Sequence, residues 1–117
     1  TYGGVLTDAK EIVDEIMDYK NPVWVFIDSD AASAGALISI ACDSIYMVPG
    51  ASIGAATVVD GTGEKAPDKY QSYMRSIMRS TAEEKGRDPR IAEAMVDQNL
   101  AIEGITEEGQ VITFSTS

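Results

Sequence analysis

Apolar residues in this chain switch between helical spacing and short unbroken runs, and this alternation predicts its elements. Over residues 5–17 the apolar side chains recur every three or four positions, which predicts an amphipathic helix. Thr7 or Asp8 is placed to cap the start of this helix, and Asn21-Pro22 ends it.

Two apolar segments and a further helix follow. Residues 23–27 are apolar without interruption and have the length of a strand, which is typical of a strand buried on both faces of a parallel sheet. Residues 33–41 carry Ala, Leu and Ile on all sides and predict a buried helix. Residues 44–48 predict the next strand, which Pro49-Gly50 closes.

The second half of the chain is less regular. Residues 54–67 hold three glycines, a proline and mixed charges, which indicates a mobile loop. Spacing predicts a long amphipathic helix from Asp68 to Gly86, a helix from Asp88-Pro89 to about Asn99, and a small hairpin over 101–114 that turns at 107–109. Without repeats or linkers, the chain is expected to form one α/β domain with parallel strands and right-handed crossovers.

Composition narrows the possible partners. With 117 residues and 44% hydrophobic content, the chain is long enough for one core. A formal net charge of −10 argues against nucleic acid or an anionic membrane surface as a partner. Cys42 is the single cysteine, so it forms no internal disulfide and no metal site and is expected to be a buried thiol. No segment approaches the roughly 20 apolar residues of a membrane span, no secretory signal is present, and no cofactor is expected.

The candidate chemistry centres on a serine without a histidine partner. The chain contains no histidine, yet Ser33 stands in Ala-Ala-Ser-Ala-Gly between a predicted strand and a predicted helix. Ser52 matches the G-x-S-x-G pattern of a nucleophile elbow more literally, but no helix is predicted after it. The strand-turn-helix context therefore favours Ser33. The N–H of Ala34 is a natural oxyanion donor beside it, and the competing interpretation is that Ser33 merely caps the helix.

A serine nucleophile needs a base, and here the base must be a lysine or a carboxylate. A lysine must lose about three pKa units, roughly 4 kcal/mol of ammonium solvation, to act as a base near neutral pH. Lys10, Lys20 and Lys85 occupy helix positions that look exposed, and Lys65 lies in the predicted loop. Lys69 follows Pro67-Asp68 at the start of the long helix, where the helix dipole disfavours an ammonium and Tyr70 and Tyr73 are expected to exclude water.

Five segments together carry a family resemblance. In this order they resemble the NfeD-type membrane-bound ClpP-class serine proteases, which are relatives of signal peptide peptidase A within the ClpP/crotonase fold. The segments are Thr1-Tyr2-Gly3-Gly4, Ala31-Ala32-Ser33-Ala34-Gly35, Pro49-Gly50-Ala51-Ser52-Ile53-Gly54-Ala55-Ala56, Pro67-Asp68-Lys69 and Ala82-Glu83-Glu84-Lys85-Gly86-Arg87.

This resemblance implies a fold, a mechanism and a substrate class. It implies a ClpP/crotonase-like α/β fold and a Ser–Lys dyad, with Ser33 as nucleophile and Lys69 as general base. It also implies an oxyanion hole from the N–H groups of Gly4 and Ala34, with Ser52 orienting the lysine. The implied substrates are hydrophobic segments of membrane proteins such as stomatin-like partners. The implied protein is a homo-oligomer and membrane-bound, with its catalytic domain on the extracytoplasmic side and no cofactor.

Some features depart from the family pattern. Tyr2 replaces the usual proline before the paired glycines, which removes a restriction on φ there. The chain opens inside the first motif and stops where relatives continue, so residues 1–117 are expected to be one ClpP-class protease domain truncated at both ends.

Two alternatives remain open. The first is a catalytically silent scaffold of the same fold that binds extended hydrophobic peptides in the same groove. The second is an acyl-CoA enzyme of the crotonase branch. That enzyme needs basic groups near the phosphates of the coenzyme, and the loop region offers only Lys65 and Lys69.

Overall fold

The structure is a computed structural model that describes residues 1–97 and 113–115. Helices and strands follow one another as α1 (Leu6–Asp18), β1 (Trp24–Ile27), β2 (Asp30–Ala32), α2 (Ala34–Ile40), β3 (Ser44–Met47), β4 (Ser52–Gly54), α3 (Asp68–Glu84), α4 (Pro89–Ala94) and β5 (Thr113–Ser115). Helices alternate with pairs of strands up to α3, and α4 then follows α3 directly.

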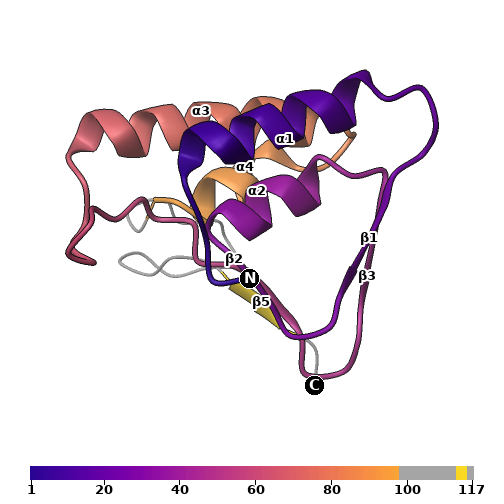
Figure 1. Ribbon diagram of the computed structural model, residues 1–117, viewed down its shortest axis with the longest axis horizontal. Helices are drawn as coiled ribbons and strands as arrows, with labels where there is room; N and C mark the ends of the chain where they lie inside the picture. The colour runs from indigo at the N-terminus through magenta and orange to yellow at the C-terminus, as the bar shows by residue number, and fades with distance from the viewer. Residues whose placement is uncertain (98–112, 116–117) are drawn as a thin grey trace.

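The strands form two small sheets that meet at an angle. β1 pairs in parallel with β3, while β2 pairs in parallel with β4, which in turn pairs antiparallel with β5. In Figure 1, β1 and β3 run side by side away from the helices, the chain turns, and β2 leads back toward α2. The two sheets and the layer of helices form the three sides of a triangle in this view. The chain therefore enters the helical layer at the end of β2, just before α2 begins.

Helix α2 lies at the centre of the core. Six of its seven residues are buried, which confirms the expectation drawn from its apolar composition. Leu37 of α2 meets Met74 and Met78 of α3 in the core cluster, and these are the largest fully buried side chains. Packing on all sides holds α2, and with it the residue that precedes it, in a fixed position.

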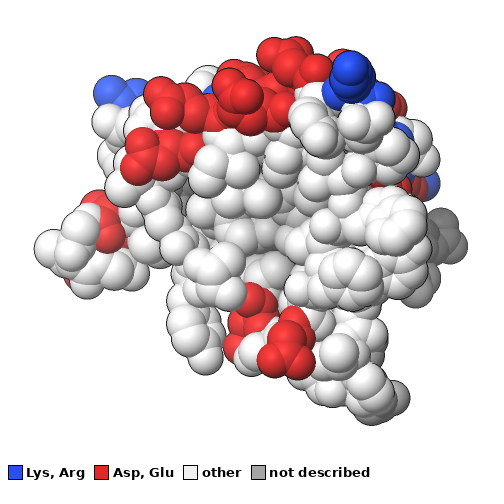
Figure 2. Space-filling model, turned by 45° about the vertical axis from the view of Figure 1, so that its right-hand side comes forward, with Lys and Arg blue, Asp and Glu red and all other residues white. Residues whose placement is uncertain are grey.

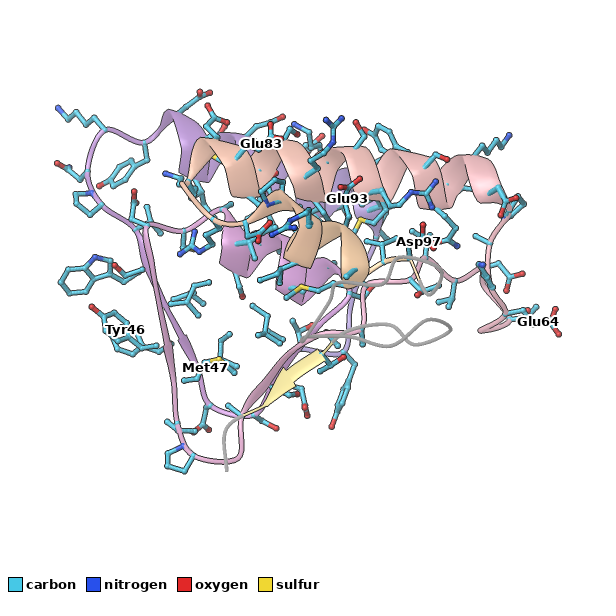
Figure 3. All side chains as sticks on the ribbon, turned by 180° about the vertical axis from the view of Figure 1, so that it is seen from behind. Tyr46, Met47, Glu64, Glu83, Glu93 and Asp97 are labelled. Carbon is cyan, nitrogen blue, oxygen red and sulfur yellow. The ribbon has the colours of Figure 1, made fainter. Side chains whose placement is uncertain are left out.

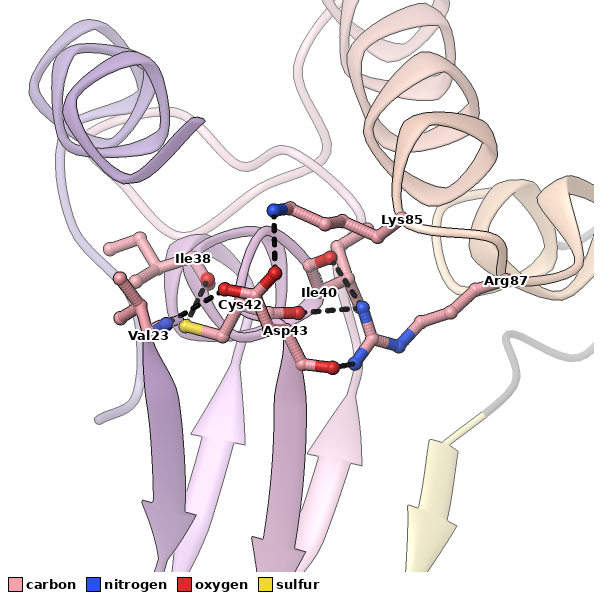
Figure 4. Close-up of polar contacts among 7 residues, drawn as sticks. All are labelled: Val23, Ile38, Ile40, Cys42, Asp43, Lys85 and Arg87. Atoms are coloured by element: carbon pink, nitrogen blue, oxygen red, sulfur yellow. Dashed lines mark hydrogen bonds and ion pairs between the residues drawn. The ribbon is translucent and has the colours of Figure 1, made fainter. Parts of the chain in front are cut away.

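The carboxyl end of α2 is tied to other parts of the chain by charged side chains (Figure 4). The guanidinium of Arg87 donates to three carbonyl oxygens there, those of Ile40 at 3.0 Å, Cys42 at 2.8 Å and Asp43 at 3.4 Å. The Asp43 carboxylate accepts from the Val23 N–H at 2.7 Å and from Lys85 Nζ at 3.1 Å, and these contacts lower its pKa, the Val23 bond most. Cys42 is buried, as expected, and burial raises the pKa of its thiol.

The expectation that residues 23–27 form a strand covered on both faces is wrong for the described part of the chain. The strand forms, but Trp24 is 59% exposed and Phe26 71% exposed. Tyr46 of β3 stacks on Phe26 with ring centroids 5.0 Å apart, and Figure 3 shows it pointing outward while Met47 points into the interior. An unbroken apolar run contains no periodicity that tells which face is covered.

The start of α1 also differs from the prediction. The helix begins at Leu6, and the residue before it makes no side-chain cap. Thr7 and Asp8 therefore lie inside the first turn, where neither is the cap residue. Asp8 still carries a negative charge near the amino end of the helix, which is favourable there.

The later helices match the prediction at their starts better than at their ends. α3 ends just before Gly86, whose φ of +73° suits glycine after a helix. The side chain of Asp88 accepts from the Arg90 N–H and caps α4, as predicted, but this helix ends at Ala94 rather than at about residue 99. The predicted hairpin over 101–114, with its turn at 107–109, lies outside the described residues apart from β5.

The stretch after β4 contains no helix, which supports the choice of Ser33 over Ser52 as the elbow residue. Residues 55–67 are irregular, with an isolated antiparallel bridge between Val59 and Lys65. The short strands β2 and β4 that flank the two serines were not predicted. They consist of three residues each and are rich in Ala, Ser and Gly, which carry little strand signal.

Candidate active site

Ser33 occupies a strained turn between β2 and α2. Its φ is 56° and its ψ is −117°, a conformation that residues with a Cβ rarely adopt. The turn is held by the Ser33 N–H, which donates to the Gly54 carbonyl at 3.0 Å, and by the Ser33 carbonyl, which accepts from the Ala36 N–H at 3.0 Å. Ser33 is the N-cap residue of α2, but its hydroxyl makes no cap bond to the helix. A serine in this turn is the arrangement of a nucleophile elbow.

The first residues of the chain face Ser33. Gly3 has a φ of +130°, and a Cβ built on it would lie 3.2 Å from Ser33 Cβ and 3.5 Å from Ser33 Oγ. Glycine at this position therefore leaves the hydroxyl accessible. The segment is attached to the end of β2, because the Ala32 N–H donates to the Thr1 carbonyl at 2.9 Å.

Two backbone donors lie beside the serine. Within residues 1–97 and 113–115, the N–H groups of Gly4 and Ala34 form no hydrogen bond. Both residues line the same cavity as Ser33. Free N–H groups that line the same cavity as a nucleophilic hydroxyl are candidate donors for an oxyanion hole.

The small size of Gly35, two residues after Ser33, is needed by the chain itself. In the structure, a Cβ on Gly35 would lie 2.3 Å from Thr1 Cγ2, so this glycine makes room for the chain's own first residue.

The cavity beside Ser33 has a volume of about 660 Å³ and a mainly apolar wall. Asp60 is the only charged residue that lines it within the described chain. The lining residues are Tyr2, Gly3, Gly4, Val5, Leu6, Ser33, Ala34, Val58, Val59, Asp60, Gly61, Ala66, Pro67, Tyr70 and Met74. Such a wall suits an apolar side chain and disfavours an acidic one.

Lys69 is close to this cavity in sequence but does not line it. Pro67 and Tyr70, on either side of Lys69, both contribute to the wall. The Lys69 side chain is exposed, and its Nζ lies 5.0 Å from the centroid of the Tyr70 ring, a cation–π contact. Tyr73 is itself 50% exposed, so the water-excluding surroundings expected for Lys69 are not formed.

The other lysines lie elsewhere. Lys10 pairs with Asp14 along α1, and Lys20 and Lys65 are exposed. Lys85, which looked exposed from its helix position, is instead half-buried and bound to Asp43. None of these lysines lines the cavity of Ser33.

Ser52 is bound to a carboxylate rather than to a lysine. Its hydroxyl donates to Asp30 Oδ1 at 2.6 Å, and Ser29 donates to Asp30 Oδ2 at 3.1 Å. The bond from Ser52 is the main reason why the pKa of Asp30 is lowered. The structure thus does not bring Ser52 to Lys69, and its role in orienting the lysine stays a prediction.

Sequence reasoning missed three residues at this site. Gly3, rather than Gly4, makes the closest approach to Ser33. Asp30 joins β2 to β4 through Ser52, and the buried side chain of Gln71 binds the cavity wall at Val58. Of these three, only Gly3 belongs to a pattern that the sequence shows, the pair of adjacent glycines. A single Asp or Gln whose partner is distant in sequence gives no local pattern that predicts its role.

A second depression, along α1, is larger but lacks comparable chemistry. It has a volume of about 730 Å³ and contains no serine, cysteine or lysine. Its charged lining is acidic and consists of Asp8, Glu11, Asp14 and Glu15. Figure 2 shows acidic side chains gathered over the helical side of the molecule, while the middle of that face is uncharged.

Comparison with known proteins identifies the family. The NfeD1b N-terminal domain family matches residues 1–117, and the chain belongs to this family. It is 36% identical over 116 residues to membrane protein NfeD1b of Bacillus subtilis, covering 98% of this chain and 26% of that protein. It is 34% identical over 110 residues to the membrane-bound protease PH1510 of Pyrococcus horikoshii, covering 87% and 25% respectively. The chain thus spans about a quarter of these relatives.

Two solved structures are similar to this chain. One is a lysine-to-alanine variant of the 1510-N membrane-bound stomatin-specific protease in complex with a substrate peptide, with a TM-score of 0.75, 33% identity and coverage of 84% of this chain and 48% of that one. The other is a serine-to-alanine variant of the same protease, with a TM-score of 0.75, 33% identity and coverage of 86% and 52%. In the described part of the present chain, no helix combines the length and apolar character needed to cross a bilayer.

Proposed function

We propose that this chain carries the nucleophilic part of a serine endopeptidase that uses a Ser33–Lys69 dyad. The observation that carries the proposal is the strained Ser33 elbow, which lines an apolar cavity together with Gly4 and Ala34, whose N–H groups have no partner within the described residues. The relative from Pyrococcus is named as a membrane-bound protease, which supports the same reaction class.

The fold we propose is ClpP/crotonase-like, with residues 1–117 forming part of one protease domain. The support is the arrangement of successive parallel strand pairs with helices stacked on one side of them. The likeness to the 1510-N protease chains, each of which this chain covers by about half, adds to it.

In the proposed reaction, the neutral amine of Lys69 takes the proton from Ser33 Oγ as this oxygen attacks the carbonyl carbon of the scissile peptide bond. The negative charge that forms on the carbonyl oxygen is stabilised by the N–H groups of Gly4 and Ala34. The C–N bond then breaks, the leaving amine takes the proton back from Lys69, and an acyl-serine remains. Water, deprotonated by Lys69, hydrolyses this ester and regenerates the Ser33 hydroxyl.

This mechanism requires the Lys69 side chain to leave the Tyr70 ring and turn into the cavity. Lysine has four rotatable side-chain bonds, and the neighbouring residues Pro67 and Tyr70 already line the wall. An exposed cation–π contact is worth only about 0.5–1 kcal/mol, so leaving it costs little. A bound apolar peptide would exclude water from the amine and favour its neutral form.

The backbone of Val59 offers a place for an extended peptide. In the hairpin that contains it, the N–H of Asp60 donates to Glu64 and the carbonyl of Val58 accepts from Ala66, so both neighbours of Val59 point toward the second leg. Backbone groups alternate in direction along a strand, and those of Val59 therefore point to the free edge. A peptide lying in the cavity can pair with this edge.

We further propose that the substrates are hydrophobic segments of membrane proteins, such as stomatin-like proteins. The support is the apolar cavity wall and the stomatin-specific protease among the similar structures. The names of both relatives support a membrane-bound parent protein. That the domain faces the extracytoplasmic side and forms a homo-oligomer are proposals that rest on the family resemblance alone.

The dyad is tested by peptide cleavage with the full-length protein. Ser33→Ala and Lys69→Ala should each lower kcat by at least about a thousandfold, since the two residues act as one unit. Lys20→Ala, which alters an exposed lysine outside the cavity and outside the hairpin that contains Val59, should leave kcat near that of the wild type. Retained turnover in either dyad variant would rule out this mechanism.

One observation favours a second function, a silent scaffold that binds extended hydrophobic peptides. Lys69 is exposed and contacts Tyr70 rather than Ser33. On this alternative, the wild-type protein binds an apolar peptide, does not cleave it, and forms no adduct at Ser33 with a fluorophosphonate.

A further inference from the structure

The wall of the Ser33 cavity includes one side of a short hairpin, residues 58–66, which we call the cavity hairpin. Its legs are joined by the bonds Ala66 N–H to Val58 O at 2.9 Å and Asp60 N–H to Glu64 O at 2.7 Å. Asp60 Oδ1 also accepts from the Thr62 N–H at 2.8 Å, which stabilises the tip. The hairpin extends away from the core, and Figure 3 shows Glu64 at the far end of the molecule from the β1–β3 sheet.

A buried side chain of α3 holds the base of this hairpin. Gln71 is 2% exposed, and its Oε1 accepts from the Val58 N–H at 2.9 Å. Its Nε2 donates to the Val58 carbonyl at 2.7 Å and to the Ala66 carbonyl at 3.1 Å. The Gln71 amide therefore pairs with Val58 as a neighbouring strand would, and also contacts the second leg.

This arrangement differs from that of another buried polar side chain in the core. The Ser39 hydroxyl donates to the Gly35 carbonyl one turn earlier in its own helix, a local bond without long-range consequence. Gln71 instead bonds to Val58, which is 13 positions away in sequence and outside α3. Its side-chain amide both accepts from the Val58 N–H and donates to the Val58 carbonyl. Gln71 lies two residues after Lys69 in the first turn of α3, which begins at Asp68.

We propose that Gln71 is a positioning residue for the peptide site. It fixes the position of the cavity hairpin so that the backbone of Val59 can pair with an extended apolar peptide beside Ser33. This proposal rests on the proposed function for the identity of the ligand. Without the Gln71 amide, the N–H of Val58 and the carbonyl of Ala66 lose the partners that the structure gives them, and water must replace them. The hairpin then samples open positions, and peptide affinity falls although the serine itself is unchanged.

The variant that tests this is Gln71→Met, which keeps the length of the side chain but removes its hydrogen bonds. Gln71→Glu is a second variant, because its carboxylate places negative charge against the Val58 and Ala66 carbonyls. The matched control is Ser76→Met, which adds a methionine to an exposed position of the same helix. All three are made in the full-length protein, in a Ser33→Ala background for binding and with Ser33 intact for labelling.

Three readouts are compared. Hydrogen exchange at the Val58 amide should be faster by on the order of tenfold in Gln71→Met, since the acceptor at Gln71 is lost, while amides in the middle of α3 keep their protection. Affinity for a fluorescent apolar peptide, measured by anisotropy, should fall by on the order of tenfold. The rate of Ser33 modification by a small fluorophosphonate, which does not need the hairpin, should stay within about twofold of the wild type.

Faster exchange at Val58 together with weaker peptide binding supports the proposal, and the Ser76→Met control should show neither change. Unchanged exchange, or faster exchange with unchanged peptide affinity, overturns it. If Gln71→Met does not fold, the peptide affinity of Gln71→Glu decides, because its carboxylate can still accept from the Val58 N–H but cannot donate to the Val58 and Ala66 carbonyls. A loss on the order of tenfold supports the proposal, and an unchanged affinity overturns it. The protease proposal fails on a different result, the absence of cleavage and of Ser33 labelling in the protein with wild-type Gln71. The binding and exchange measurements do not depend on that result.

Discussion

Replacing Arg87 by alanine should destabilise the protein more than any other change of a surface charge. Arg87 donates hydrogen bonds to carbonyl groups at the carboxyl end of α2, the helix that follows Ser33. The variant removes a charged donor from the carbonyls of Ile40 and Cys42, at 3.0 Å and 2.8 Å, and from a weaker contact with Asp43 at 3.4 Å. Two good bonds from a charged group, worth about 1.5 kcal/mol each, give a loss of about 3 kcal/mol. With an m-value of about 1.5 kcal/mol per molar urea, the unfolding midpoint falls by about 2 M.

The assay is urea unfolding of the full-length protein, followed by tryptophan fluorescence from the single Trp24, which lies on β1 at the other side of the same cluster. Arg87→Lys keeps the charge but cannot donate in a planar fork to several carbonyls. Its unfolding midpoint should therefore lie between those of the wild type and Arg87→Ala. Arg90→Ala is the control, because Arg90 pairs with the neighbouring Asp88 on an exposed surface and its loss should barely move the midpoint. A midpoint for Arg87→Ala that equals that of Arg90→Ala would refute this account of the α2 end.

Three further predictions test the site, the core and the response to acid. Gly3→Ala should slow Ser33 modification severalfold or more, measured by mass spectrometry, because the new Cβ would lie 3.2 Å from Ser33 Cβ and a φ of +130° strains alanine by about 1–3 kcal/mol. Leu37→Ala should cost about 2–5 kcal/mol of unfolding free energy in calorimetry, since Leu37 is 0% exposed. The pKa of Asp30 is lowered in the fold, so its stabilisation is present above its ordinary pKa and is lost as pH falls through the lowered value. Ser52→Ala removes the main cause of this shift, and its unfolding free energy should fall less steeply than that of the wild type below about pH 4; an equal slope would show that the Ser52–Asp30 bond has no such effect.

Regular elements with a strong pattern could be predicted from sequence. The spacing of apolar residues located α1 and α3, and the all-round apolar character of residues 33–41 correctly indicated a buried α2. Ser33 was also found from sequence, because a small-residue turn between a strand and a helix is a local feature. The family resemblance supplied the candidate partners Lys69 and Gly4, and neither assignment is tested by the fold.

The rest depended on contacts that have no local signal. Which face of β1 is covered depends on what packs against it, and an unbroken apolar run does not encode this. Arg87 and Gln71 act on backbone groups far away in sequence, so each looked like an ordinary polar helix-end or helix residue. The Lys69 side chain lies over the exposed Tyr70 ring, a contact that its place at the start of α3 does not predict.

The most direct test of the central claim is the pH dependence of covalent modification at one oxygen atom. Full-length protein is treated with a fluorophosphonate across the neutral to alkaline range, and the modified residue is identified by mass spectrometry in the wild type and in Lys69→Met. Our account predicts an adduct on Ser33 whose rate of formation rises with pH, as an amine base loses its proton, and which is nearly absent in Lys69→Met. An adduct on Ser33 that forms at the same rate in Lys69→Met would contradict it.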